Sequence, residues 1–271
     1  MKSPILFLVV LALQGFLWVT PPLAEASQRS VVVKVFSETV YNYDYPRMWP
    51  RGPLKKTVST SGSGTAFLVD YDDRLFLVTA AHVISGPRTP DFIEAEGIRV
   101  ERNQITEASF RFRVSHLAAR PQKIAVDRHS DLAVIMIERE VLDALNLRPL
   151  RSSRTHDASR SVLRWGRSSR GPLSVDEQVR VWGFPGTTQP QVNPGDMRVT
   201  SVQPNYFVLN SGIEGGYSGG PVVDNDDNLV GVAARSTDRQ ARCAPLNALL
   251  TLLKEFDERA VNYRDGMPPL F

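Results

Sequence analysis

The chain has 271 residues, of which 42% are hydrophobic, with only 18 Gly and 19 Pro. This composition excludes a disordered chain, a collagen-like repeat and a disulfide-stapled miniprotein, and it allows a sizeable core. The formal net charge of +3, from 32 basic and 29 acidic residues, is too even for nucleic-acid binding to be expected. The single cysteine, Cys243, excludes an internal disulfide and is predicted to be a small buried hydrophobe.

The N-terminus has the pattern of a secretory signal peptide. Lys2 is followed by an apolar run from Pro4 to Val19, and small residues at Ala24 and Ala26 predict cleavage after Ala26. The mature protein would then span residues 27–271 and be exported, either to a periplasm or to the medium. An uncleaved anchor is the alternative, but the apolar run is shorter than the roughly 20 residues that span a bilayer. No stable membrane anchor is therefore expected.

The rest of the chain is predicted to form many short strands separated by turns, which is the pattern of an all-β sandwich or barrel. A first hairpin is expected around the turn Asp70–Asp73. Its strands, and the further predicted ones, cover residues 64–69, 75–79, 110–114, 131–137, 178–183, 197–202, 206–210, 221–223 and 229–233. A terminal helix is expected over about 245–258, because leucines recur there at helical spacing after Pro245. These are Leu246, Leu249, Leu250 and Leu253.

Three segments carry residue types that covalent acyl transfer needs. One predicted strand ends in small residues and His82, another begins at Asp131, and Ser218 lies in a glycine-dense turn. A serine hydroxyl is almost never ionised near neutral pH, so Ser218 needs a base such as His82 to take its proton. A carboxylate such as Asp131 would hold the imidazole in the correct tautomer. The glycines of the turn would let the amides of Gly216 and Ser218 point at one developing oxyanion.

These segments resemble those of chymotrypsin-fold serine proteases, in particular the HtrA-type and other bacterial trypsin-like peptidases. The motifs TAAHV, SDLAV and GYSGGPV occur in that family's order, and the resemblance covers about Ser63 to Ser236, including SGSGTAFLVD and VWGFPG. It implies two antiparallel β-barrels, at about 27–140 and 150–241, followed by the terminal helix and with the active site between the barrels. It also implies a serine endopeptidase without a cofactor, acting on protein or peptide substrates. Its catalytic triad would be His82, Asp131 and Ser218, with the amides of Gly216 and Ser218 as the oxyanion hole.

The resemblance also places a pocket for the substrate side chain that precedes the cut bond. Alignment on Ser218 puts Gly212 and Ile213 on one wall of this pocket, and neither carries a charge. The opposite wall would come from Ala234, Arg235 and Ser236. A substrate Lys or Arg buried there would lose its hydration without a partner, so cleavage after small or aliphatic residues is expected. Glu214 is the alternative, since its carboxylate could restore a preference for basic residues.

Two departures from the family pattern affect these expectations. Tyr217 stands where relatives usually carry Asp or Asn, so the oxyanion turn needs a different anchor. A catalytically inactive binding module with the same fold is therefore the alternative function. The few residues after the terminal helix leave no room for the PDZ domain of many HtrA-type proteins, and none is expected.

Other assignments of the same residues fit less well. The turn around Ser218 also matches the G-x-S-x-G elbow of α/β-hydrolases, but that fold needs a histidine after the serine and all four histidines precede it. His129 and Asp127 could compete with His82 and Asp131, but only Asp131 begins an apolar strand, and His129 is expected to be solvated. The acidic stretch 224–228 lacks the Gly and Glu of a calcium loop, so a hairpin turn is expected and no metal site.

Two segments leave their roles open. Between Arg148 and Arg170 lie seven arginines and one acid, which favours a solvated loop between the barrels, with a site for an anionic partner as the alternative. The stretch from Tyr41 to Pro53 interleaves aromatic residues with arginine. It is predicted to be a surface loop packed by its own aromatics, with a regulatory or substrate-side loop as the alternative.

Overall fold

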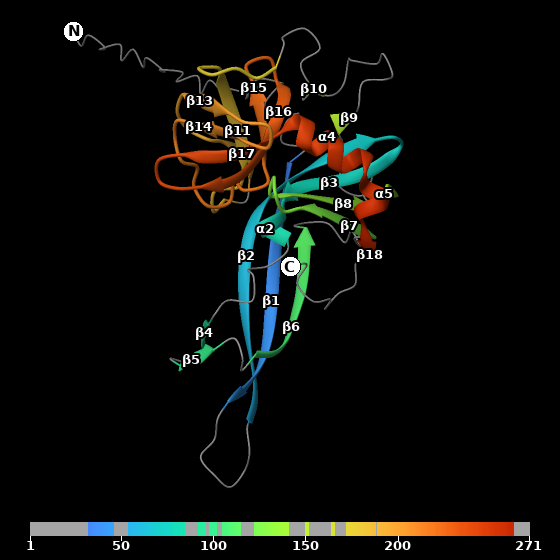
Figure 1. Ribbon diagram of the computed structural model, residues 1–271, viewed down its shortest axis with the longest axis vertical. Coiled ribbons are helices and arrows are strands. Elements are labelled where there is room, and N and C mark those ends of the chain that lie inside the picture. The colour runs from blue at the N-terminus through green and yellow to red at the C-terminus, as the bar shows by residue number, and fades with distance from the viewer. Residues whose placement is uncertain are drawn as a thin grey trace, which may run out of the picture.

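The computed structural model describes residues 32–45, 54–84, 92–95, 98–101, 105–114, 122–140, 150–151, 164–165, 172–187 and 189–262. Over these residues the chain is mostly β-strand, and Figure 1 shows two β units with a helix at their junction. The all-β double-barrel architecture with a C-terminal helix is confirmed. The predicted signal peptide and most of the Arg148–Arg170 segment lie outside the described residues. No helix in the described part of the chain is long and apolar enough to span a membrane.

The N-terminal barrel has the strand order β18-β7-β8-β3-β2-β1-β6. Its strands are β1 (Val32–Tyr45), β2 (Leu54–Tyr71), β3 (Arg74–Ala80), β6 (Ile105–Val114), β7 (Lys123–Asp127), β8 (Leu132–Ile137) and β18 (Val261–Asn262), and β9 (Leu150–Arg151) pairs in parallel with β2. The predicted first hairpin is confirmed, since β2 and β3 pair antiparallel. Asp72 and Asp73 turn the chain with φ of 53° and 58°, a left-handed conformation that Asp adopts more readily than most residues.

Strands β1, β2 and β6 extend beyond the barrel as a three-stranded arm, which points away from both barrels in Figure 1. A separate hairpin of β4 (Phe92–Ala95) and β5 (Ile98–Glu101) lies beside it. Tyr41 and Tyr43 are buried in a small cluster with Val100. The predicted surface loop is therefore wrong for residues 41–45, which continue β1 because alternate side chains meet apolar partners from distant segments. Residues 46–53 lie outside the described residues.

Six strands form the C-terminal barrel, in the spatial order β11 (Gln178–Gly183), β13 (Met197–Val202), β14 (Phe207–Leu209), β17 (Ala241–Pro245), β16 (Asn228–Ser236) and β15 (Pro221–Asp224). The ring is closed, because β16 pairs with both β15 and β17 and β15 pairs with β11. Two short strands add to it: β10 (Arg164–Trp165) pairs with β16, and β12 (Gln191–Val192) pairs with β11. The predicted hairpin turn at 224–228 is confirmed, with the Asp224 carboxylate accepting the N–H groups of Asp226 and Asn228. Cys243 is fully buried as predicted, and burial raises the pKa of its thiol.

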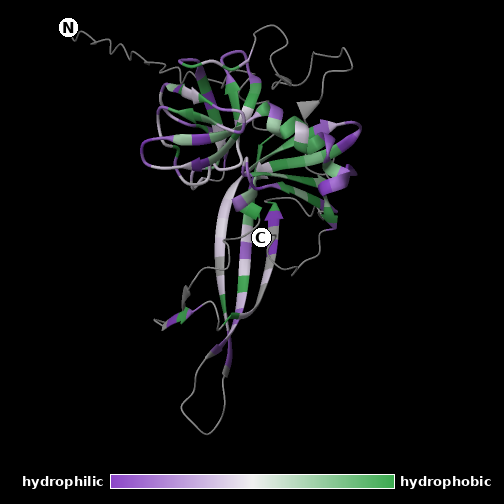
Figure 2. Cartoon of the chain, viewed as in Figure 1, coloured by the Kyte–Doolittle hydropathy of each residue, from purple (hydrophilic) through white to green (hydrophobic). Residues whose placement is uncertain are grey.

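The terminal helices α4 (Leu246–Lys254) and α5 (Phe256–Arg259) pack against both barrels. They contribute Leu249, Leu252, Leu253 and Phe256 to one core cluster that also contains residues of β3 and β16. The helix is confirmed, but Leu252 is buried where the spacing favoured Leu250, which is 39% exposed. Figure 2 shows hydrophobic residues concentrated in the barrels and at this junction, whereas polar residues are common along the arm.

Candidate active site

His82 and Asp131 are brought together by two neighbouring strands. His82 lies in the short helix α2 (Ala81–Ile84), which follows β3, and Asp131 directly precedes β8, which pairs with β3. Asp131 Oδ1 accepts the backbone N–H of His82 at 3.0 Å, and Oδ2 lies 2.9 Å from His82 Nδ1. An ionised carboxylate only accepts hydrogen bonds, so Nδ1 is assigned as the protonated nitrogen and Nε2 is left as an acceptor.

Asp131 reaches this geometry through an unusual backbone conformation. Its φ of 57° lies in the left-handed region, and its carbonyl accepts the N–H of Ala81 at 2.9 Å. A non-glycine residue held in this region at a small energetic cost is typical of functional sites. Arg235 Nε also donates to Asp131 Oδ2, at 3.2 Å. Burial would raise the pKa of Asp131, but the hydrogen bonds and charge of His82 and the charge of Arg235 outweigh it, so the pKa lies below its usual range.

Ser218 lies in the turn before β15, on the side of the C-terminal barrel that meets the N-terminal barrel. A Cβ atom on Gly64 would come within 3 Å of both the Val83 side chain and the Ser218 carbonyl, so the α2 helix and the serine turn lie close together. Strand β16 links the same parts, since Ala234 contacts Ser218 and the next residue contacts Asp131. Ser218 Oγ donates to the Ala234 carbonyl at 3.2 Å. Within the described residues no hydrogen bond joins this hydroxyl to His82.

The backbone of the serine turn is almost fully hydrogen-bonded. The carbonyl of Tyr217 accepts from Gly220 N–H at 2.9 Å, and Gly219 N–H donates to Ala233 at 2.7 Å. The carbonyls of Gly216 and Ser218 accept hydrogen bonds from the N-terminal barrel, described below. Of the N–H groups of residues 216–220, only those of Gly216 and Ser218 donate to no acceptor in the described part of the chain. These are the two amides that the sequence predicted as oxyanion donors.

Two glycines allow this turn to form. Gly216 has a φ of +101°, and a Cβ atom there would lie 2.1 Å from the Phe184 carbonyl oxygen, so only glycine fits. Gly183 ends β11 against Tyr217, where a Cβ atom would lie 2.6 Å from the tyrosine ring. The VWGFPG segment is therefore needed for the close approach of β11 to the serine turn.

Tyr217 anchors the turn by packing instead of by charge. Its side chain is fully buried in the core of the C-terminal barrel, in the same cluster as Ile213 and Val181. Within the described residues its hydroxyl has no hydrogen-bond partner. Burial, together with the nearby Glu214 carboxylate, raises the pKa of Tyr217 to about 12. A neutral ring thus occupies the position for which the family resemblance leads us to expect a polar anchor.

The residues predicted to line the substrate pocket lie next to one another. Ile213 N–H donates to Ser236 Oγ at 2.8 Å, and a Cβ atom on Gly212 would lie 2.1 Å from the Thr237 carbonyl oxygen. The two predicted walls are therefore in direct contact. Ile213 packs into the barrel core and is 7% exposed, while the Arg235 side chain contacts Asp131.

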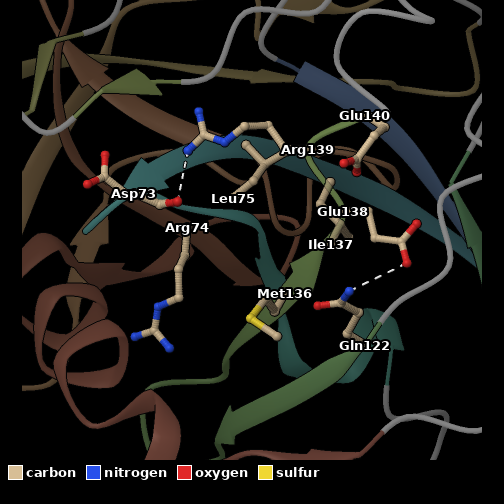
Figure 3. A pocket seen from close by; sticks show the side chains of 9 residues that line it. All are labelled: Asp73, Arg74, Leu75, Gln122, Met136, Ile137, Glu138, Arg139 and Glu140. Carbon is tan, nitrogen blue, oxygen red and sulfur yellow. Dashed lines mark hydrogen bonds between the residues drawn. The ribbon is translucent and has the colours of Figure 1, made fainter.

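A separate open groove lies at the opposite ends of β3 and β8 from His82 and Asp131 (Figure 3). Several of its charged and polar groups have hydrogen-bond partners in the groove or beside it. Arg139 donates to Asp70 and to the Asp73 carbonyl, and Gln122 donates to Glu138, as the dashed lines in Figure 3 show for two of these contacts. This groove adds no group to the site around Ser218.

His129 and Asp127, the alternatives to His82 and Asp131 in the sequence, lie outside the site. His129 is exposed; its N–H donates to Asp127, and its Nε2 lies 2.7 Å from Asn205 Nδ2 of the C-terminal barrel. Neither His129 nor Asp127 contacts the site. Within the described residues no three His, Cys, Asp or Glu side chains are grouped as a metal site would require.

The family model of the trypsin-like peptidase domain matches residues 64–232. The chain belongs to the trypsin-like peptidase family. It is therefore a serine-type endopeptidase, and the resemblance read from its motifs is confirmed. Similar solved structures include the Rv3671c protease from M. tuberculosis in its active form, at 16% identity and a TM-score of 0.47, covering 90% of this chain and 86% of that one. The HtrA-type protease AlgW with a decapeptide shares 18% identity at a TM-score of 0.49, covering 87% of this chain and 66% of that one. No curated protein sequence matches.

Two residues make contacts at the site that the sequence did not predict. Arg235 was assigned to the pocket wall, and nothing local in the sequence indicates its contact with Asp131. Thr65 contacts the serine turn from the other barrel. Its only signal was its place in SGSGTAFLVD, the segment that belongs to the family resemblance.

Proposed function

We propose that this peptidase is an exported enzyme that cleaves peptide bonds through an acyl-enzyme on Ser218, with His82 as general base and Asp131 as the orienting carboxylate. The observation that carries the proposal is the double contact of Asp131 with His82. It holds the imidazole with Nε2 free to accept a proton. The amides of Gly216 and Ser218, which donate to no acceptor among the described residues, supply the second requirement, a pair of donors for an oxyanion.

These groups can carry the reaction through four proton transfers. Ser218 Oγ leaves its bond to Ala234 by rotating between staggered χ1 rotamers, and it attacks the substrate carbonyl carbon while its proton passes to His82 Nε2. The amides of Gly216 and Ser218 bind the negative oxygen of the tetrahedral intermediate. Cleavage of the C–N bond releases the amine, which takes the proton from His82. Water then attacks the ester carbonyl while giving a proton to His82 Nε2, and the C–O bond to Ser218 Oγ breaks as His82 returns that proton to Oγ, which releases the carboxylic acid product and restores Ser218.

Labelling with a fluorophosphonate probe tests the nucleophile directly. The mature wild-type protein should react at Ser218, and Ser218→Ala should abolish labelling. Ser218→Ala or His82→Ala should lower kcat by up to about a millionfold, because these residues act as a unit, and Asp131→Ala should cost less. Ser61→Ala, which removes an exposed hydroxyl on the arm, is the matched control and should label normally. Ordinary peptidase activity in pure Ser218→Ala protein would rule out the assignment.

The specificity expected from the sequence is supported by the contact between the two pocket walls. The Ser236 hydroxyl bridges them, and Gly212 lies against the Thr237 carbonyl, so little depth is left for a substrate side chain. We therefore propose cleavage after Ala, Val or residues of similar size, with modest discrimination because each CH₂ contributes only about 0.8 kcal/mol. Profiling with a peptide library should show this preference. A dominant Lys or Arg before the cut, lost in Glu214→Gln, would instead assign specificity to Glu214.

A further inference from the structure

Thr65 in β2 joins the N-terminal barrel to the serine turn through its side chain. Its hydroxyl donates to the Gly216 carbonyl oxygen at 2.6 Å and accepts the Phe184 N–H at 3.1 Å. A carbonyl can only accept and an amide can only donate, so both functions of the hydroxyl are fixed. Thr65 is fully buried, where an unpaired carbonyl or amide would be costly.

The backbone of Thr65 adds two more contacts to the same region. Its N–H donates to the Ser218 carbonyl at 2.8 Å, and its carbonyl accepts the Thr79 hydroxyl at 2.6 Å. Thr79 lies in β3, three residues before His82. One residue therefore links the strand that carries the proposed base to the turn that carries the proposed nucleophile.

The hydrogen bond from the Thr65 hydroxyl matters because of where the Gly216 carbonyl lies in the serine turn. This carbonyl belongs to the peptide group that joins Gly216 to Tyr217, which lies between the two proposed oxyanion donors, the amides of Gly216 and Ser218. Rotation of that peptide group would change the backbone angles on both sides and turn the amides apart. Its other contacts are longer: Phe184 N–H lies 3.4 Å from the same carbonyl, and Tyr217 N–H lies 3.5 Å from the Glu214 carbonyl. The Thr65 hydroxyl is the shortest bond to this peptide group.

We propose that Thr65 is a positioning residue that holds the Gly216–Tyr217 peptide group so that the amides of Gly216 and Ser218 converge on the oxyanion. Thr65 acts through the turn and does not touch the substrate. The inference rests on the proposed function and explains how an oxyanion turn stays ordered when Tyr217 provides no polar anchor. The tyrosine ring fixes one side of the turn in the C-terminal barrel, and the threonine hydroxyl fixes the other side from the N-terminal barrel.

Thr65→Val and Thr65→Ser separate the hydroxyl from the shape of the side chain. Thr65→Val keeps the volume and loses both hydrogen bonds, whereas Thr65→Ser keeps the hydroxyl. Thr39→Val is the matched control, because Thr39 lies in the same sheet and is 1% exposed but does not contact the turn. The measurements are kcat and KM on one peptide, the rate of fluorophosphonate labelling, the Tm, and the affinity for a peptidyl aldehyde, whose adduct places an oxyanion between the two amides.

Thr65→Val should lower kcat and the labelling rate by about 10- to 100-fold, somewhat less than the loss of a whole oxyanion donor. KM should change by less than about threefold, and aldehyde affinity should fall by the same factor as kcat, since both depend on the oxyanion. Thr65→Ser should stay within about threefold of the wild type, and Thr39→Val should match the wild type in kcat.

A purely structural role predicts a different result. Thr65→Val would then lower the Tm while kcat per folded molecule and aldehyde affinity stayed at the wild-type level, which would overturn the inference. If Thr65→Val does not fold, the pair Thr65→Ser and Thr65→Ala differs by the hydroxyl alone, and equal kcat values in that pair would overturn it equally. Absence of labelling in the wild type would refute the proposed function, whereas labelling of wild type and Thr65→Val at one rate would refute only the role of Thr65.

Discussion

Tyr217 shows how one side chain can change the way a turn is held. A polar residue next to the nucleophile would need a partner for its charge or its hydrogen bonds, whereas a buried ring needs only a cavity of its own shape. Gly183 provides this space by bringing the end of β11 against the ring without a side chain. The cost is a tyrosine hydroxyl that, within the described residues, is buried without a partner. Such a group typically costs about 1–3 kcal/mol.

Tyr217→Phe should therefore keep activity and leave the free energy of unfolding unchanged or raise it by about 1 kcal/mol, because only the unpaired hydroxyl is lost. Tyr217→Ala removes the ring and should lower the free energy of unfolding by about 3–5 kcal/mol, with slower fluorophosphonate labelling. Urea unfolding and labelling rates measure the two effects. Loss of labelling in Tyr217→Phe would show that the hydroxyl has a partner in the working enzyme.

The raised pKa of Tyr217 gives this prediction a pH dependence. An unfolded tyrosine ionises near pH 10, whereas folded Tyr217 keeps its proton to about pH 12. The neutral form is thus favoured by folding, so its contribution to stability is complete below pH 10 and is lost as the pH rises through 12. The unfolding free energy of the wild type should fall more steeply over this window than that of Tyr217→Phe. Equal slopes would contradict the raised pKa.

Arg235 shows the opposite case, an exposed side chain that acts on a buried carboxylate. Its side chain is 70% exposed while that of Asp131 is 9% exposed, so solvent and salt weaken its effect. Arg235 nevertheless adds to the two contacts from His82 in keeping Asp131 ionised. Asp131 can therefore orient the imidazole at pH values where an ordinary aspartate begins to take up a proton.

At the scale of elements, local pattern predicted the parts of the chain whose structure depends on near neighbours. The bounds of β11 and β13 match the predicted strands 178–183 and 197–202, because alternation and flanking turn residues define them locally. His82, Asp131 and Ser218 were proposed from the sequence because each stands where a predicted strand meets a turn, and the structure places His82 in contact with Asp131. The side-chain geometry between them could not be predicted, because it depends on three strands and a turn from distant parts of the chain.

Contacts between distant segments explain what the sequence did not predict. The sequence around Tyr41 and Tyr43 has the pattern of a surface loop, but in the structure both side chains are buried against Val100, nearly sixty residues later in the chain. The contact of Thr65 with Gly216 crosses 151 positions and joins two barrels, so no local period could indicate it. Leu252 is buried in place of Leu250 because the helix is seated between two barrels, and the exact orientation is set by both.

At the scale of the whole molecule, the two barrels form one structural unit around the site. A single core cluster takes Phe76 from β3, Val232 from β16 and Leu253 from the terminal helix. The proposed base and its carboxylate come from the N-terminal barrel, whereas the nucleophile and the oxyanion amides come from the C-terminal barrel. The junction therefore has to keep the barrels in register for the reaction to proceed. The terminal helix contributes by filling the space between them with apolar side chains.

The proposed export also concerns the whole molecule, because removal of the predicted signal peptide would have to leave the fold intact. Cleavage after Ala26 would leave five residues before β1 begins at Val32, whose side chain is 3% exposed in the shared core. The buried Cys243 needs no reducing compartment, since burial raises the pKa of its thiol and keeps it unreactive. The mature protein recovered from an exporting host should therefore begin at Ser27, as read by N-terminal sequencing. Replacement of Ala26 by a large charged residue, Ala26→Arg, should block processing and retain the precursor. Intact Met1 on wild-type protein recovered from outside the cytoplasm would contradict cleavage.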